Sequence, residues 1–126
     1  MPGNYELFVK ADFSAAHCLK GYEGNCSRVH GHNWTVTLFL KCGGLDEIGI
    51  GIDFRKIKLK LADIIGRLDH KDLNSLEPFR DTNPTSENIA RFVYREAAKT
   101  INSASVRVSR VTVSETGNTG ATYWED

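Results

Sequence analysis

Three of the four histidines, His17, His30 and His32, flank one loop at positions that predict a common face. His17 continues an alternation of apolar and polar residues that starts at Tyr5, whereas His30 and His32 extend backward the apolar positions that follow from Trp34. If the two segments pair as a hairpin, all three imidazoles point to one side. Neutral imidazoles are good zinc ligands, and three of them leave a fourth tetrahedral position for water or substrate. We therefore expect one metal ion, zinc rather than iron or nickel, because the motif holds no carboxylate.

Cys26 stands four residues before His30, in the run Cys-Ser-Arg-Val-His-Gly-His. Its thiolate has two alternative roles. As a fourth metal ligand it would close the site and make the metal structural, whereas beside an open metal it would act as a base or nucleophile. The other cysteines, Cys18 and Cys42, have no such motif, and three cysteines are an odd and sparse set. We expect free thiols in a reducing compartment.

Two further groups of residues have side chains suited to chemistry. Asp69 and His70 place a carboxylate beside an imidazole at the end of a predicted helix, although helix-end and turn preferences explain them equally well. Glu115 continues the apolar positions Val111 and Val113, so we expect it to face the interior, where a bare carboxylate is costly. A ligand with two adjacent N–H donors, such as a pterin or guanine ring, would satisfy it. The alternative is an exposed glutamate at a strand end.

The elements that must position these residues can be read from apolar spacing. In chain order we expect a strand from Tyr5 that His17 continues, a strand through Trp34–Leu40, a helix from Asp53 to near Asp69, a helix from Asn83-Pro84-Thr85-Ser86 to about Asn102, a strand from Val106 to Val113 and a short strand at Ala121–Trp124. The apolar stripe of the first helix comprises Phe54, Ile57, Leu61, Ile64 and Leu68.

The third of these strands changes phase along its length. Val106 and Val108 alternate in one phase and Val111 and Val113 in the other, which predicts a β-bulge near Ser109 or Arg110. Because each amphipathic helix needs an apolar surface to cover, the order predicts an α+β fold, with both helices on one face of a four-stranded, mainly antiparallel sheet. The open edges of such a sheet favour oligomerisation.

Composition limits the classes of protein that remain. The 126 residues, 40% hydrophobic and 25% charged, are expected to form a single domain over 1–126. Sixteen Lys and Arg balance sixteen Asp and Glu, so no charge pattern for nucleic acid or an anionic membrane is present. No apolar run approaches the roughly twenty residues of a membrane span, and Met1–Lys10 lacks the features of a signal peptide. We expect a cytoplasmic protein.

Six motifs together resemble the 6-pyruvoyl-tetrahydropterin synthase and 6-carboxytetrahydropterin synthase family. They are Phe13-Ser-Ala-Ala-His17, Cys26 with His30-Gly-His32, Gly51-Ile-Asp53-Phe54, Leu68-Asp-His70 with Leu73-Asn74, Pro84-Thr-Ser-Glu-Asn88, and Ser114-Glu-Thr116. They follow the family's order over nearly the whole chain. Their joint occurrence is far more specific than any single motif.

The resemblance implies roles for individual residues. These are zinc ligands His17, His30 and His32; a proton-transfer group of Cys26, Asp69 and His70; and pterin-pocket residues Glu115, Thr85 and Glu87. Glu115 would anchor the pterin ring and belong to the catalytic residues, and Thr85 and Glu87 would come from a neighbouring subunit. Helix capping is an alternative role for Thr85.

The resemblance also implies an assembly and a reaction. In a tunnelling fold, three subunits close a twelve-stranded barrel and two trimers stack into a homohexamer. The implied substrate is 7,8-dihydroneopterin triphosphate. The short spacing from Cys26 to His30 resembles the bacterial carboxytetrahydropterin enzymes of the queuosine precursor pathway, which form 6-carboxy-5,6,7,8-tetrahydropterin and release acetaldehyde and triphosphate. The alternatives are 6-pyruvoyl-tetrahydropterin synthase, which leaves the side chain uncleaved, and a non-catalytic zinc- or pterin-binding protein.

Overall fold

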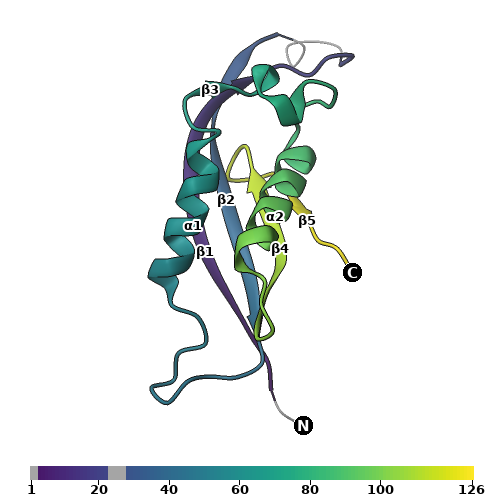
Figure 1. Cartoon of the computed structure of the whole chain (residues 1–126). Coiled ribbons are helices and arrows are strands. Elements are labelled where there is room, and N and C mark those ends of the chain that lie inside the picture. The colour runs from purple at the N-terminus through teal and green to yellow at the C-terminus, as the bar shows by residue number, and fades with distance from the viewer. Residues whose placement is uncertain (1–2, 23–27) are drawn as a thin grey trace.

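A mixed five-stranded sheet forms the centre of the fold in a computed structural model that describes residues 3–22 and 28–126 (Figure 1). The strands lie in the order β3-β1-β2-β4-β5. Their bounds are β1 Tyr5–His17, β2 His30–Cys42, β3 Lys71–Asp72, β4 Val106–Ser114 and β5 Ala121–Tyr123. Neighbouring strands are antiparallel, except that β3 runs parallel to β1.

The prediction of four strands is wrong because it omits β3. This strand consists of two residues, Lys71 and Asp72, which pair with Ala15 and Ala16 of β1. A run of two residues has no alternation from which a strand could be predicted. The last strand is also one residue shorter than expected, because β5 ends at Tyr123.

The β1–β2 hairpin confirms the two predicted alternations. Its ladder runs without interruption from the pair Tyr5–Cys42 to the pair His17–His30. The buried side chains come from odd positions of β1, such as Phe13, and mainly from even positions of β2, such as Trp34. Both alternations therefore direct side chains into one core.

The predicted bulge in β4 is confirmed at Ser109. Phe39 lies opposite Arg110 and Leu40 opposite Val108, which leaves Ser109 as an extra residue on β4. Val108 and Val111 are consequently both buried, although one position is even and the other odd.

Two helices cover the same face of the sheet, as predicted (Figure 1). Helix α1 (Phe54–Gly66) packs against β1, and helix α2 (Ser86–Ile101) packs against β4 and β5. The short 3₁₀ helices η2 (Leu73–Ser75) and η3 (Glu77–Phe79) lie between them in the chain. Among the described residues, no helix combines the length and apolar composition required to span a membrane.

The ends of α1 differ in part from the prediction. The Asp53 side chain caps the helix as expected, accepting a hydrogen bond from the Arg55 N–H. Phe54, predicted in the buried stripe, is 48% exposed because it lies in the first turn. The helix ends at Gly66 rather than near Asp69, but Leu68 beyond it is still buried.

The start of α2 also needs a correction. Thr85 is the capping residue, because its side chain accepts a hydrogen bond from the Asn88 N–H at 3.1 Å. Pro84 was expected to open the helix but instead precedes the cap. Its carbonyl group is therefore free of the helix and available to another partner.

Candidate functional site

The three histidines meet at one end of the β1–β2 hairpin. His17 and His30 are the last pair of the ladder, and His32 lies opposite Ala15. The ring centroids lie 4.6, 4.7 and 5.2 Å apart. One ring nitrogen from each histidine lies within 4.8 Å of the other two, a set that could hold a metal ion. The convergence predicted from their positions is confirmed.

Aromatic residues form the apolar side of this cluster. The Trp34 ring centroid lies 4.9 Å from that of His17 and 5.4 Å from that of His32. Trp34 is fully buried, and its indole N–H donates to the Ala15 carbonyl at 3.3 Å. Phe13 stacks on the indole in turn. The imidazoles of His17 and His32 therefore pack against a buried, apolar surface.

Backbone carbonyl groups fix the tautomers of two of the rings. The Nδ1 atom of His17 lies 2.7 Å from the Pro84 oxygen, and Nδ1 of His30 lies 2.7 Å from the Arg28 oxygen. A carbonyl oxygen can only accept, so each Nδ1 carries the proton and each Nε2 a lone pair when the ring is neutral. These two Nε2 atoms lie 3.1 Å apart, where neither can donate to the other. The Nε2 atom of His32 is buried and makes no hydrogen bond of acceptable geometry among the described residues, although a carboxylate oxygen of Glu115 lies 3.3 Å away.

A metal ion bound to these nitrogens would account for lone pairs that face one another. Zinc binds imidazole nitrogens at about 2.0–2.1 Å, which places tetrahedral ligands about 3.3 Å apart. The separation of 3.1 Å between the Nε2 atoms of His17 and His30 is close to that value. Burial lowers the pKa of His17, although the Pro84 carbonyl and the charge of Glu115 act in the opposite direction. The neutral form that binds metal is thereby favoured, so the residues present fit a metal centre.

Glu115 lies beside the imidazoles, directly after β4. Its Oε2 atom is 3.3 Å from Nε2 of His32, and its Oε1 atom accepts a hydrogen bond from the Ser86 hydroxyl at 3.4 Å. The side chain is 30% exposed, so it is half-buried rather than enclosed. It is not part of the group within 4.8 Å that could hold the metal. The histidine motif contains no carboxylate, but the fold places one next to it.

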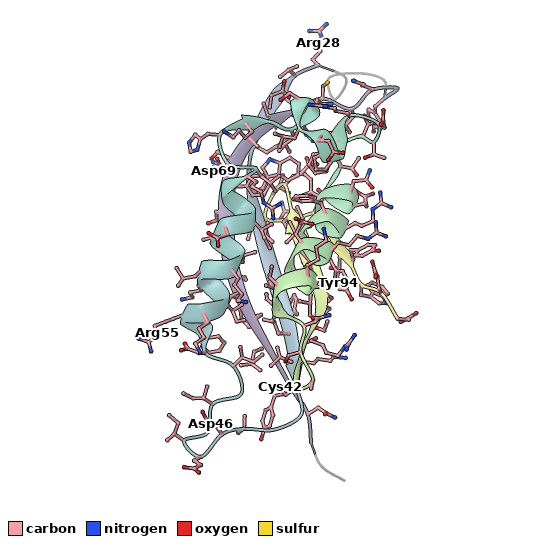
Figure 2. The ribbon with its side chains drawn as sticks, viewed as in Figure 1. Arg28, Cys42, Asp46, Arg55, Asp69 and Tyr94 are labelled. Atoms are coloured by element: carbon pink, nitrogen blue, oxygen red, sulfur yellow. The ribbon has the colours of Figure 1, made fainter. Side chains whose placement is uncertain are left out.

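Asp69 and His70 follow α1 and contact β1 at Ser14, on the edge of the strand that does not pair with β2. Figure 2 labels Asp69. Asp69 accepts a hydrogen bond from the Ser14 N–H at 2.9 Å and lies 3.0 Å from Nδ1 of His70. The hydrogen bond from the Ser14 N–H is the main cause of the lowered pKa of Asp69, and the contact with His70 lowers that pKa further. The His70 side chain is 81% exposed. In the part of the chain that the structure describes, no hydrogen bond or ion pair joins this pair to the three histidines.

Comparison with known proteins agrees with this arrangement. The family model described as 6-pyruvoyl tetrahydropterin synthase matches residues 6–126. The chain belongs to this family. The resemblance read from the six motifs is confirmed, and with it membership of a family of lyase-type pterin synthases.

Relatives within the family are named either 6-carboxy-5,6,7,8-tetrahydropterin synthase or 6-pyruvoyl tetrahydropterin synthase. The 6-carboxy-5,6,7,8-tetrahydropterin synthase of Bacillus subtilis is 38% identical over 98 residues, which cover 74% of this chain and 65% of that protein. The enzyme of the same name from Synechocystis is 31% identical over 123 residues, covering 94% and 92%. The structure of Caenorhabditis elegans 6-pyruvoyl tetrahydropterin synthase superposes with a TM-score of 0.87 at 27% identity, covering 98% and 97% of the two chains.

The other residues with predicted roles in this family member are placed as follows. Cys26 lies outside the described residues, so both of its alternative roles remain predictions. The Thr85 hydroxyl caps α2, and Glu87 is exposed in the first turn of that helix. Among the described residues, Cys18 and Cys42 are free thiols. Cys42 lies at the far end of the hairpin from the histidines (Figure 2).

Two partners in the site were not predicted from the sequence. The Pro84 carbonyl orients His17, and Ser86 contacts Glu115. Both residues belong to the family motif Pro84-Thr-Ser-Glu-Asn88, which was the available signal for their importance. A backbone carbonyl has no residue-type signature, so its role requires the fold.

Proposed function

We propose that this family member converts 7,8-dihydroneopterin triphosphate to 6-carboxy-5,6,7,8-tetrahydropterin, with release of acetaldehyde and triphosphate. The convergence of three imidazole nitrogens beside a half-buried glutamate carries the proposal. Two relatives that bear the carboxytetrahydropterin name and the short spacing from Cys26 to His30 favour this product. The reaction would supply the queuosine precursor pathway in the cytoplasm.

The metal in this proposal is one zinc ion per chain, held by His17, His30 and His32. When bound, zinc supplies a positive charge that polarises the oxygens of the substrate side chain and acidifies the neighbouring C–H bonds. The protein contributes the orientation of the ligands. The Pro84 carbonyl holds the His17 ring, and the buried Trp34 indole supports it from one side.

Glu115 would bind the pterin ring. Its carboxylate offers two acceptor oxygens, which match the adjacent N3–H and 2-amino donors of a pterin. The Ser86 hydroxyl donates to one of these oxygens and so orients the carboxylate. Thr85 and Glu87 would complete a neighbouring subunit's pocket.

Proton transfer is assigned to Cys26, Asp69 and His70. In this proposal one subunit supplies Cys26 and the imidazoles, and another supplies Asp69 and His70. Within the described residues no hydrogen bond or ion pair joins Asp69 or His70 to the imidazoles of the same chain, which favours a site shared between copies. A tunnelling-fold trimer with a twelve-stranded barrel, stacked into a homohexamer, would bring them together. In this proposal the whole chain acts as one pterin synthase domain.

The second candidate is 6-pyruvoyl tetrahydropterin synthase, favoured by the structural similarity to the enzyme from Caenorhabditis elegans. Incubation of the zinc-loaded protein with 7,8-dihydroneopterin triphosphate, followed by mass spectrometry of the products, distinguishes the candidates. Acetaldehyde together with 6-carboxytetrahydropterin supports the proposed reaction. Triphosphate release without acetaldehyde supports the second candidate. Zinc retention with no turnover of either kind would indicate a non-catalytic binding protein.

A further inference from the structure

The chain immediately after His17 is held by two asparagine side chains from a distant segment. Asn74, in η2, accepts a hydrogen bond from the Cys18 N–H at 2.8 Å and donates to the Cys18 carbonyl at 3.0 Å. Asn83, before α2, accepts from the Lys20 N–H at 2.9 Å and donates to the Lys20 carbonyl at 2.9 Å. Each carboxamide thus binds both backbone polar groups of one residue.

This pattern imitates the pairing of a β-strand. In an extended chain the backbone groups of alternate residues point to the same side, and the two asparagines likewise bind alternate residues, Cys18 and Lys20. The ladder of β1 with β3 covers only Ala15 and Ala16, and β1 itself ends at His17. Asn74 and Asn83 continue the pairing beyond that end. A carboxamide suits this purpose because it offers one donor and one acceptor side by side.

Both asparagines are themselves fixed by the elements around them. Asn74 donates its own backbone N–H to the Asp72 side chain at 3.2 Å, and η2 is anchored by the fully buried Leu73. The Asn83 carbonyl accepts hydrogen bonds from the Thr85 N–H at 2.9 Å and from the Asn88 side chain at 2.8 Å. The two amides therefore act from positions tied to the core and to the start of α2.

The link to the site is the peptide that joins Asn83 to Pro84. Asn83 holds the Lys20 backbone, and the next carbonyl, that of Pro84, accepts a hydrogen bond from Nδ1–H of His17 at 2.7 Å. The same short segment thus fixes the imidazole ring and the chain three residues beyond it. We propose that Asn74 and Asn83 are positioning residues. They hold the backbone after His17, so that the Nε2 atom of His17 points toward the metal site that it shares with His30 and His32. This inference rests on the metal site proposed above.

Cobalt binding tests the proposal, because the visible absorption of Co²⁺ reports both affinity and ligand geometry. Asn74→Ala and Asn83→Ala should each weaken Co²⁺ binding roughly ten- to a hundredfold and alter the spectrum, the usual cost of losing a group that orients a metal ligand. Asn4→Ala, an exposed asparagine at the other end of β1, is the matched control and should bind Co²⁺ as the unmodified chain does. Unchanged Co²⁺ affinity and spectrum in both variants, even with a lower melting temperature, would overturn the proposal.

A measurement on the unmodified protein keeps the test independent of whether the variants fold. The backbone amides of Cys18 and Lys20 should exchange with deuterium at least tenfold more slowly than in an unstructured peptide. Exchange at the rate of the unstructured peptide would also overturn the proposal. The two proposals fail distinguishably. If the unmodified chain binds no Co²⁺, or if His32→Ala binds it equally well, the proposed metal site is wrong. If Co²⁺ binds at the histidines but the two asparagine variants match the unmodified chain, only the positioning role is wrong.

Discussion

His17 and Pro84 are joined by a hydrogen bond of 2.7 Å between the imidazole Nδ1 and the backbone carbonyl, across 67 residues of sequence. His17 is only 1% exposed, so water does not compete for this bond. It ties the end of β1 to the start of α2. The orientation of one ligand in the candidate metal site therefore depends on the packing of the helix layer as well as on the hairpin.

Removal of a histidine should remove the metal. His30→Ala or His32→Ala leaves two imidazoles, and loss of a ligand should cost more than the roughly 10–100-fold in affinity that follows loss of a group that only orients one. Zinc content of the purified variants measures this. His70→Ala is the control, because His70 is exposed and outside the cluster. Full zinc content in folded His30→Ala and His32→Ala would contradict the assignment of these ligands.

Glu115→Gln should fold and bind pterin poorly. The amide replaces one acceptor with a donor, which then faces a ring N–H, and loss of a charged hydrogen bond costs about 1.5–3 kcal/mol, roughly ten- to a hundredfold in affinity. Calorimetry with a non-reactive pterin gives the value. Glu77→Gln, exposed in η3, makes the same chemical change away from the site and should have no effect. Equal affinity of Glu115→Gln and the unmodified chain would leave the pterin anchor unassigned.

Cys26→Ala separates the two roles of the thiolate. If Cys26 transfers a proton, the variant should keep its zinc and its melting temperature, and turnover should fall by roughly a hundredfold or more. If Cys26 is a structural ligand, zinc retention and melting temperature should fall together. Zinc content, melting temperature and acetaldehyde release measured on one preparation decide between them. Cys18→Ala is the control for loss of a thiol.

Asp69 should make stability depend on pH in the acid range. Its pKa is lowered, mainly by the Ser14 N–H, so the unfolded chain takes up a proton at a higher pH than the folded chain does. The stabilising contribution is present above the ordinary aspartate pKa of about 3.9 and is lost as pH falls through the lower folded value. Urea unfolding should show Asp69→Asn to be less stable near pH 6, with the difference shrinking below about pH 4. A difference independent of pH would contradict the assignment; Asp63→Asn, exposed on α1, controls for the lost charge.

Assembly can be measured directly. Within the described residues, β3 covers only Ala15 and Ala16 on the outer edge of β1, and β5 is a short strand at the opposite edge. Such edges favour pairing with further copies. Light scattering should give the mass of six chains at micromolar concentration. A stable monomer there would argue against the barrel and against a site shared between subunits.

The sequence was sufficient to predict features that depend on periodicity. The parity of His17, His30 and His32 predicted their convergence, and the phase change in β4 predicted the bulge. Each signal extends over several residues of a regular strand, where side-chain direction follows from counting. The same reasoning placed Glu115 on the side of the imidazoles.

Features that depend on single contacts between distant segments could not be predicted. β3 is too short for a pattern, and the Pro84 carbonyl is a backbone group. The roles of Asn74 and Asn83 depend on which residues lie opposite them, which neither asparagine reveals in sequence. Their residue type indicates a turn equally well.

The number of paired residues in β4 sets the direction of Glu115, so the site is sensitive to insertions and deletions on one side only. Val108 and Glu115 face the same way because one residue between them is not paired. Deleting Ser109 would leave an unbroken alternation in which Val108 and Glu115 still share a face. Loss or gain of one paired residue between them would instead turn Glu115 away from His32 while Val108 stays in the core. The turn before β4 carries no such constraint, since its length does not set the direction of any side chain in the site. Relatives that keep this chemistry should therefore vary in length before Val106 and conserve the number of paired residues between Val108 and Glu115, with or without the bulge.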